Sequence, residues 1–116
     1  MMMTYQRFKE GAPRRIMAAL GPIFLEALDR MPNYPAFRRA IVMLNDADRG
    51  CFAKAARRYA RVCSPGEREL LKGILLLTDF AHVADEIAGG EAYGNMTRCG
   101  GDFREALAAC VVNAGW

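Results

Sequence analysis

Apolar residues recur at helical spacing along most of the chain, and the clearest block is residues 64–87, SPGERELLKGILLLTDFAHVADEI. Ser64 followed three residues later by Glu67 is the pattern of a capping box, in which each side chain accepts a hydrogen bond from the other residue's backbone N–H. Pro65 fits the first helical position, where its missing N–H leaves no bond unmade. A helix that is apolar on nearly all sides is typical of a buried centre, so we expect a central helix over about residues 65–77. Its apolar residues are Leu70, Leu71, Ile74, Leu75, Leu76 and Leu77.

Shorter amphipathic segments, separated by Gly, Pro and Asn, precede this block. Residues 1–10 form a lead that is a candidate for loose order, with one helical turn capped by Thr4. Pro13 opens a helix and Pro22 restarts it, because Pro22 has no N–H to donate to the carbonyl of Ala18. Two amphipathic helices follow a break at residues 32–35. Their inward stripes are Phe37, Ala40, Ile41 and Leu44 in the first, and Phe52, Ala55, Ala56, Tyr59 and Val62 in the second.

The segment after residue 77 contains signals that end helices. Thr78-Asp79 leaves two alternatives open, which are one kinked helix over residues 65–88 or two helices with a break between them. Gly89-Gly90 ends the helix in either case, and a long glycine-rich loop over residues 89–101 precedes a last helix capped by Asp102. No segment alternates apolar and polar residues as a strand does. We therefore predict an all-α fold, a compact single-domain bundle of six or seven helices over residues 1–116.

Composition narrows the class of protein. A chain of 116 residues holds one core, and its hydrophobic content of 53% excludes a disordered chain. No unbroken apolar run approaches the roughly 20 residues of a membrane span, so we expect no membrane partner. The four cysteines, at 51, 63, 99 and 110, form no CxxC pair, and we expect reduced thiols in a cytoplasmic protein. Thirteen of the sixteen basic residues are Arg, a usage that favours a bacterial source, a phage or mobile element included.

Charge is divided unevenly along the chain. Residues 1–62 carry twelve basic and five acidic side chains, a net +7, while residues 63–116 carry four basic and eight acidic ones, a net −4, which together give +3. A basic half favours an acidic partner. The alternative is that the two halves neutralise each other across the folded surface.

The best-defined candidate site is a row of basic residues, here called the basic ridge: Lys54, Arg57, Arg58 and Arg61. Their spacing of i, i+3, i+4 and i+7 places them on one face of one helix. Four positive charges on a rigid element are suited to binding phosphates or an acidic protein surface. The alternative is a solvated helix back, because the inward stripe of an amphipathic helix requires polar residues opposite.

Nucleic-acid binding through the ridge is limited to phosphate contacts. The helix that follows the ridge carries leucines, whereas the second helix of a helix-turn-helix motif presents polar residues to base edges. No aromatic residues alternate with the basic ones to stack bases.

Two other sets of residues are weaker candidates. His82 lies at helical spacing from Asp79, Asp85 and Glu86. This set has one histidine and none of the usual zinc spacing, so we expect no metal and predict that His82 pairs with Glu86. The glycine-rich loop contains Tyr93, Met96 and Arg98, and Tyr and Arg are residue types that often dominate binding energy. The alternative for this loop is a plain connector whose Tyr93 packs on the core.

No nucleophile elbow, phosphate loop, dinucleotide fingerprint or paired-carboxylate motif is present. The sequence therefore favours a small non-enzymatic protein, without cofactor, that binds another protein with an acidic surface and acts as a regulator or inhibitor. The alternative function is a nucleic-acid-binding accessory protein that uses the basic helix face.

Overall fold

The computed structural model describes residues 3–88 and 102–114, with side chains in the last stretch from Arg104 on. Within these residues the chain is all-α, as predicted, and has eight helices, one more than the upper end of the predicted range. They are α1 (Tyr5–Glu10), α2 (Ala12–Leu20), α3 (Pro22–Arg30), α4 (Tyr34–Ala47), α5 (Cys51–Ala60), α6 (Pro65–Leu77), α7 (Ala81–Ala88) and α8 (Asp102–Val112).

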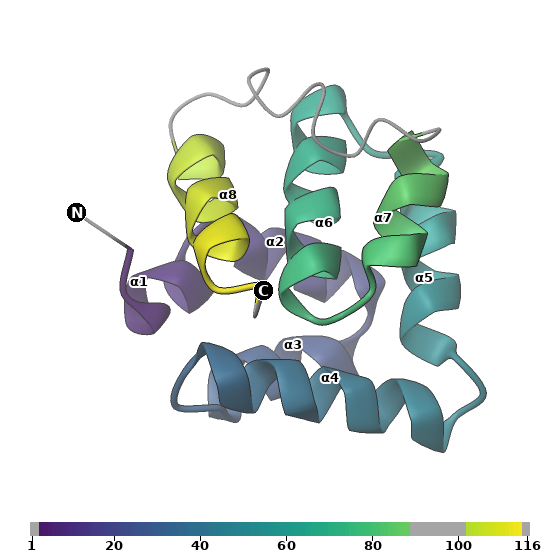
Figure 1. Cartoon of the computed structure of the whole chain (residues 1–116), viewed down its shortest axis with the longest axis horizontal. Coiled ribbons are helices and arrows are strands. Elements are labelled where there is room, and N and C mark those ends of the chain that lie inside the picture. The colour runs from purple at the N-terminus through teal and green to yellow at the C-terminus, as the bar shows by residue number, and fades with distance from the viewer. Residues whose placement is uncertain (1–2, 89–101, 115–116) are drawn as a thin grey trace.

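Helix α6 is the centre of the bundle, as the sequence predicts. The capping box is present: Ser64 Oγ accepts from Glu67 N at 3.2 Å, and Glu67 Oε1 accepts from Ser64 N at 3.0 Å. All the leucines of α6 and its isoleucine are at most 5% exposed. Figure 1 shows α6 between α8 and α7, with α3 and α4 beneath, and α6 also contacts α2 and α5.

Two charged residues of α6 lie inside the protein, which the sequence analysis did not predict. Glu69 is 5% exposed and Lys72 is 2% exposed, and Glu69 Oε2 lies 2.8 Å from Lys72 Nζ. A buried charge is costly unless it is paired. Their spacing of i, i+3 lets one helix supply both members of the pair.

Helices α6 and α8 approach closely at Gly73. A Cβ on Gly73 would lie 2.4 Å from Leu107 Cδ1 and 3.3 Å from Cys110 Cβ, distances at which a neighbour must move. The missing side chain therefore lets α8 pack against the centre of α6. Arg38 of α4 supports the same pair of helices, because its guanidinium donates to the carbonyls of Leu77 and Asn113 near their C-terminal ends.

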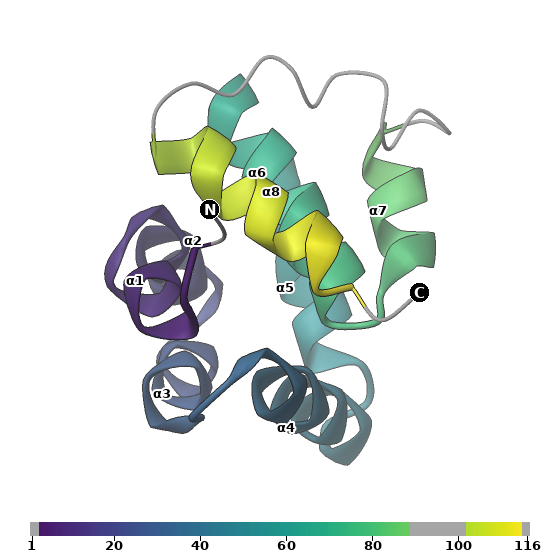
Figure 2. The same cartoon turned by 60° about the vertical axis from the view of Figure 1, so that its left-hand side comes forward.

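The N-terminal lead is packed into the core. Thr4 caps α1 as expected, and Tyr5 and Phe8 are both buried. Their rings contact those of Tyr34 and Phe37 in α4, with Tyr34 at 5.2 Å from each of the two, and Tyr5 Oη donates to Leu28 O at 2.6 Å. Figure 2 shows α1 and α2 on one side of α8 and α7 on the other.

The two breaks that the sequence placed at Pro22 and after residue 77 both occur. Helix α3 begins at Pro22, one residue after the end of α2. Residues 65–88 form two helices, because α6 ends at the cap Thr78 and Asp79 has a φ of 74°, in the left-handed region that a continuous helix does not visit. Phe80 follows this turn, and its ring centroid lies 5.3 Å from that of Phe52 of α5 with the two rings tilted.

The end of α5 differs from the prediction. Val62, predicted to face inward, is 80% exposed, since α5 ends at Ala60 and the helical periodicity does not extend to residue 62. Helix α5 has no side-chain N-cap hydrogen bond. Its N-cap residue is Gly50, which has a φ of 80°. Asn45, which belongs to α4, nevertheless accepts a hydrogen bond from the first turn of α5, because its Oδ1 lies 3.0 Å from Ala53 N.

Candidate functional site

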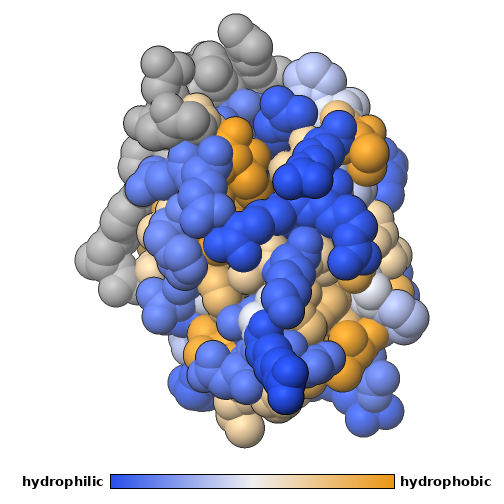
Figure 3. All heavy atoms as spheres, turned by 90° about the vertical axis from the view of Figure 1, so that its right-hand side faces the viewer, coloured by the Kyte–Doolittle hydropathy of each residue, from blue (hydrophilic) through white to orange (hydrophobic). Residues whose placement is uncertain are grey.

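The basic ridge lies on the outer face of α5. Lys54, Arg58 and Arg61 are exposed, while Phe52 and Ala56 on the inner side are fully buried. Figure 3 views the molecule from the side of α5 and α7 and shows hydrophilic side chains over most of this face. The spacing of the ridge therefore gives the predicted geometry, with Arg61 standing at the C-cap, just beyond the last helical residue.

The fourth member of the ridge, Arg57, is already paired. Its Nε lies 2.8 Å from Glu86 Oε2 and its Nη2 lies 3.2 Å from Glu86 Oε1, a two-pronged contact that joins α5 to α7. The hydrogen bonds from Arg57 hold the pKa of the Glu86 carboxyl below its usual range, and the hydrogen bond with Glu86 raises the pKa of Arg57. Glu86 thus pairs with Arg57, which corrects the expectation that it pairs with His82.

A hollow of about 320 Å³ lies beside this pair, between α5, α6 and α7. The charged groups that line it are the guanidinium groups of Arg57, Arg61 and Arg68 and the carboxylate of Glu86. Arg68 is a residue that the sequence analysis missed. Its Nη2 donates to Ala60 O at 2.8 Å, which places a cation at the C-terminal end of α5, where the helix dipole favours it. The signal for Arg68 was the short connection between the two helices, which brings the first turn of α6 beside the end of α5.

Apolar side chains stand among these charges. Ile87 lines the hollow, and the exposed Val62 is adjacent to Arg61 in the chain. Protein interfaces characteristically combine an apolar centre with arginines and aromatic residues, whereas the phosphate backbone of a nucleic acid is met by positive charge. The arrangement is therefore a mixed surface, positively charged with apolar positions.

The remaining reactive side chains are those of His82, its neighbouring carboxylates and the cysteines. Among residues 3–88 and 104–114, no three His, Cys, Asp or Glu side chains are grouped so that they could hold a metal ion. Cys51, Cys63 and Cys110 are free thiols, and burial raises the pKa of Cys63 and of Cys110. A nucleophilic cysteine needs the opposite shift, toward the thiolate.

The loop candidates Tyr93, Met96 and Arg98, together with Cys99, lie outside the described residues. In the part of the chain that the structure describes, no helix has the length and apolar character needed to cross a membrane.

Comparison of the chain with models of protein families, with curated proteins and with solved structures finds no match. The geometry of the basic ridge and its surroundings is therefore what bears on function.

Proposed function

We propose that this protein is a non-enzymatic binding module that contacts an acidic surface of another protein through the basic ridge and Arg68. The observation that carries the proposal is the mixed face at the end of α5, where Ile87 and three arginines line one hollow and the exposed Val62 follows Arg61 in the chain. A module of this kind acts by occupying its partner's surface, as regulators and inhibitors do. The free thiols at 51, 63 and 110 suit a reducing compartment such as the cytoplasm.

Electrostatics supports association with an acidic protein more than with a nucleic acid. Arg58, Arg61 and Lys54 are exposed and extend their charge into solvent, which accelerates encounter with an acidic surface. Glu86 lies within the same face and Asp85 is exposed next to it on α7. A carboxylate within this face opposes a continuous row of phosphates, whereas a protein partner can present carboxylates only where the arginines lie.

The test is a charge reversal that leaves the Arg57–Glu86 pair intact. Arg58→Glu with Arg61→Glu changes two exposed side chains and places acidic charge at the C-terminal end of α5, so the free energy of unfolding should fall by at most about 1 kcal/mol per site. Wild type and variant would be used to capture proteins from an extract of the source cell, and the captured protein would be identified and its binding kinetics measured. We expect the association rate to fall at least about tenfold in the variant.

Arg39→Glu with Arg104→Glu is the matched control, because it makes the same change in net charge at two exposed arginines on α4 and α8. The control should bind like wild type. A partner held equally by wild type and by the Arg58, Arg61 variant would contradict the proposal. Binding of a mixed-sequence DNA duplex, with a salt dependence that flattens by about one unit per arginine replaced, would favour the nucleic-acid alternative instead.

A further inference from the structure

A second surface, formed by α3 and α4, is apolar and open. A groove of about 580 Å³ runs between the two helices, and Ile23 and Met43 on it are 52% and 70% exposed. Large apolar side chains exposed together mark an interaction site more often than a free surface. The groove is lined by Ile23, Glu26, Ala27, Arg30, Met31, Ala40, Met43, Leu44 and Ala47.

Helix α4 carries two apolar stripes, one fully buried in the core and one that lines the groove. Tyr34, Phe37 and Ile41 are buried in the core. Ala40, Met43, Leu44 and Ala47 have the spacing i, i+3, i+4 and i+7, and all four line the groove. Ala40 and Leu44, predicted to face inward, are half-buried and pack against the edge of the core. Met43 and Ala47 continue the same stripe outward and are exposed.

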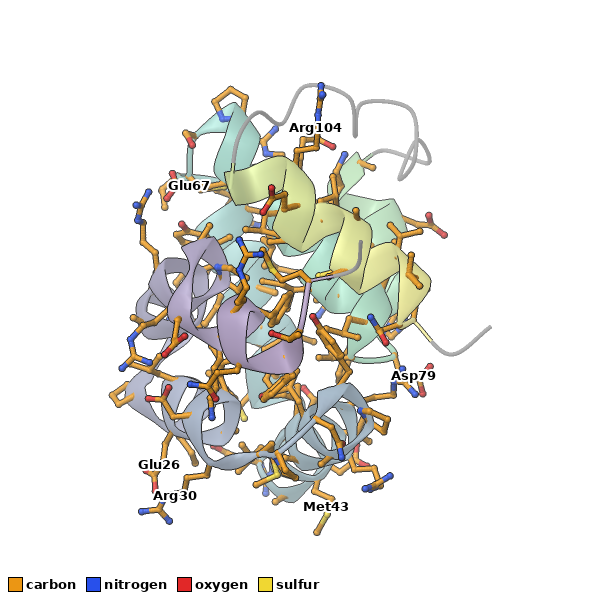
Figure 4. All side chains as sticks on the ribbon, turned by 90° about the vertical axis from the view of Figure 1, so that its left-hand side faces the viewer. Glu26, Arg30, Met43, Glu67, Asp79 and Arg104 are labelled. Atoms are coloured by element: carbon orange, nitrogen blue, oxygen red, sulfur yellow. The ribbon has the colours of Figure 1, made fainter. Side chains whose placement is uncertain are left out.

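The surface of the groove contains both open space and a protruding side chain. The alanines at 27, 40 and 47 leave space in the lining, and Met43 is a long, flexible side chain that extends from the same surface. Figure 4 shows Met43 pointing away from the body of the protein, and Glu26 and Arg30 side by side on α3. When two identical surfaces meet about a two-fold axis, every contact occurs twice, so a protruding side chain and a hollow on one patch can satisfy each other.

The charged residues at the groove can also pair with the same residues of a second copy. Glu26 Oε1 and Arg30 Nη2 are 2.9 Å apart, one helical turn along α3, and these are the two charged residues in the lining. A two-fold axis perpendicular to α3 makes the two copies of the helix antiparallel, which brings Glu26 of one copy opposite Arg30 of the other. The lining has no net charge, so two copies meet without repulsion, unlike two copies of the basic ridge.

We propose that the α3–α4 groove binds a second copy of this chain and forms a two-fold symmetric dimer, in which Met43 of each copy enters the groove of the other. This surface is separate from the basic ridge, and the dimer leaves Arg58 and Arg61 accessible. The two surfaces can therefore be tested independently of each other.

Sedimentation of the full chain over micromolar to millimolar concentrations tests the dimer. We expect wild type to shift from monomer to dimer with rising concentration. Met43→Glu should weaken the dimer at least about tenfold, because it places a charge in a desolvated apolar contact. Val62→Glu is the matched control, since it makes the same kind of change at an exposed apolar residue of another face, and should leave the dimer unchanged.

A charge exchange tests the symmetry. Glu26→Arg and Arg30→Glu should each weaken the dimer about tenfold through two like-charge contacts, and the double variant should regain wild-type dimerisation. Helix content and the midpoint of urea unfolding at low concentration show that each variant folds. A wild type that stays monomeric throughout, or a Met43→Glu variant that dimerises as well as Val62→Glu, overturns the proposal.

Discussion

Helices α5 and α6 are neighbours in the chain, yet each contributes to an ion pair of a different kind. Arg57 of α5 and Glu86 lie 2.8 Å apart with 41% and 53% of their side-chain surface exposed. Glu69 and Lys72 of α6 also lie 2.8 Å apart, but their side chains are only 6% and 2% exposed. The distance is the same in the two pairs, so burial determines how much each pair contributes to the stability of the fold.

The exposed pair is screened by water and salt, so its contribution to stability is small. The buried pair has lost its water on both sides, and each charge depends on the other for compensation. The Arg57–Glu86 pair thus remains in contact with solvent, while the Glu69–Lys72 pair is committed to the fold. The following predictions test this difference between the surface of α5 and the buried centre of α6.

The largest effect is expected from breaking the buried pair. Lys72→Met keeps the length of the side chain but leaves the Glu69 carboxylate buried without its cation, which should lower the free energy of unfolding by about 3–5 kcal/mol. Arg57→Met, the matched change in the exposed pair, should cost less than about 1 kcal/mol. Urea unfolding measures both.

A second variant separates loss of the ion pair from loss of packing. Replacing both partners, Glu69→Leu with Lys72→Met, removes the uncompensated charge and should recover most of the stability that Lys72→Met alone loses. If Lys72→Met costs no more than Arg57→Met, the two pairs are equivalent and burial is not what distinguishes them.

The next effect concerns the apolar residues of the two helices. Leu75 is fully buried in α6, and Leu75→Ala should cost about 2–5 kcal/mol through lost burial and a cavity. Val62, just beyond α5, is exposed, and Val62→Ala should change the stability by less than about 0.5 kcal/mol. A denaturant melt in which Leu75→Ala matches wild type would exclude α6 as the centre of the core.

The sequence predicted the elements whose signals are local. The capping box at Ser64, the restart at Pro22 and the all-round apolar pattern of α6 each depend on residues within one or two turns. The spacing of the basic ridge is local in the same sense, so its shared face was predicted correctly.

Features that depend on contacts between helices were not predictable in this way. Glu69 and Lys72 have the same i, i+3 spacing as a surface pair, and their burial is a property of the bundle. Arg57 lies in the ridge by periodicity, but its bond to Glu86, 29 residues away in sequence, depends on the packing of α7 against α5. The same holds for Val62, whose exposure follows from where α5 ends.

Two glycines of α6 extend the comparison within a single helix. Gly73 faces α8, where a Cβ would lie 2.4 Å from a buried leucine, so Gly73→Ala should destabilise the fold by about 1–3 kcal/mol. Nothing lies within 4 Å of a Cβ at Gly66, and Gly66→Ala should be neutral or stabilising by up to about 1 kcal/mol, because alanine favours the helix. Thermal unfolding should show a lower midpoint for Gly73→Ala and an unchanged or higher midpoint for Gly66→Ala, and equal shifts would contradict the close approach of α8.

The smallest effect is expected where α5 and α6 meet. Ser64→Ala removes the hydroxyl that accepts from Glu67 N and should cost about 1 kcal/mol, whereas Ser64→Asp keeps an acceptor and should cost less. Glu67 takes part in the same junction, because its carboxylate accepts from Ser64 N and from Tyr59 Oη of α5.

These contacts make the junction sensitive to acid. The pKa of Glu67 lies below its usual value, mainly because of hydrogen bonding with Ser64, its backbone first, and then because of the hydrogen bond from Tyr59. The stability that the Glu67 carboxylate contributes is therefore complete above its unfolded pKa of about 4.3. It is lost as the pH falls through the lower pKa that Glu67 has in the folded protein. The stability difference between wild type and Glu67→Gln should shrink as the pH is lowered from about 5. A difference that stays constant across this range would mean that the carboxylate form of Glu67 does not hold the two helices together.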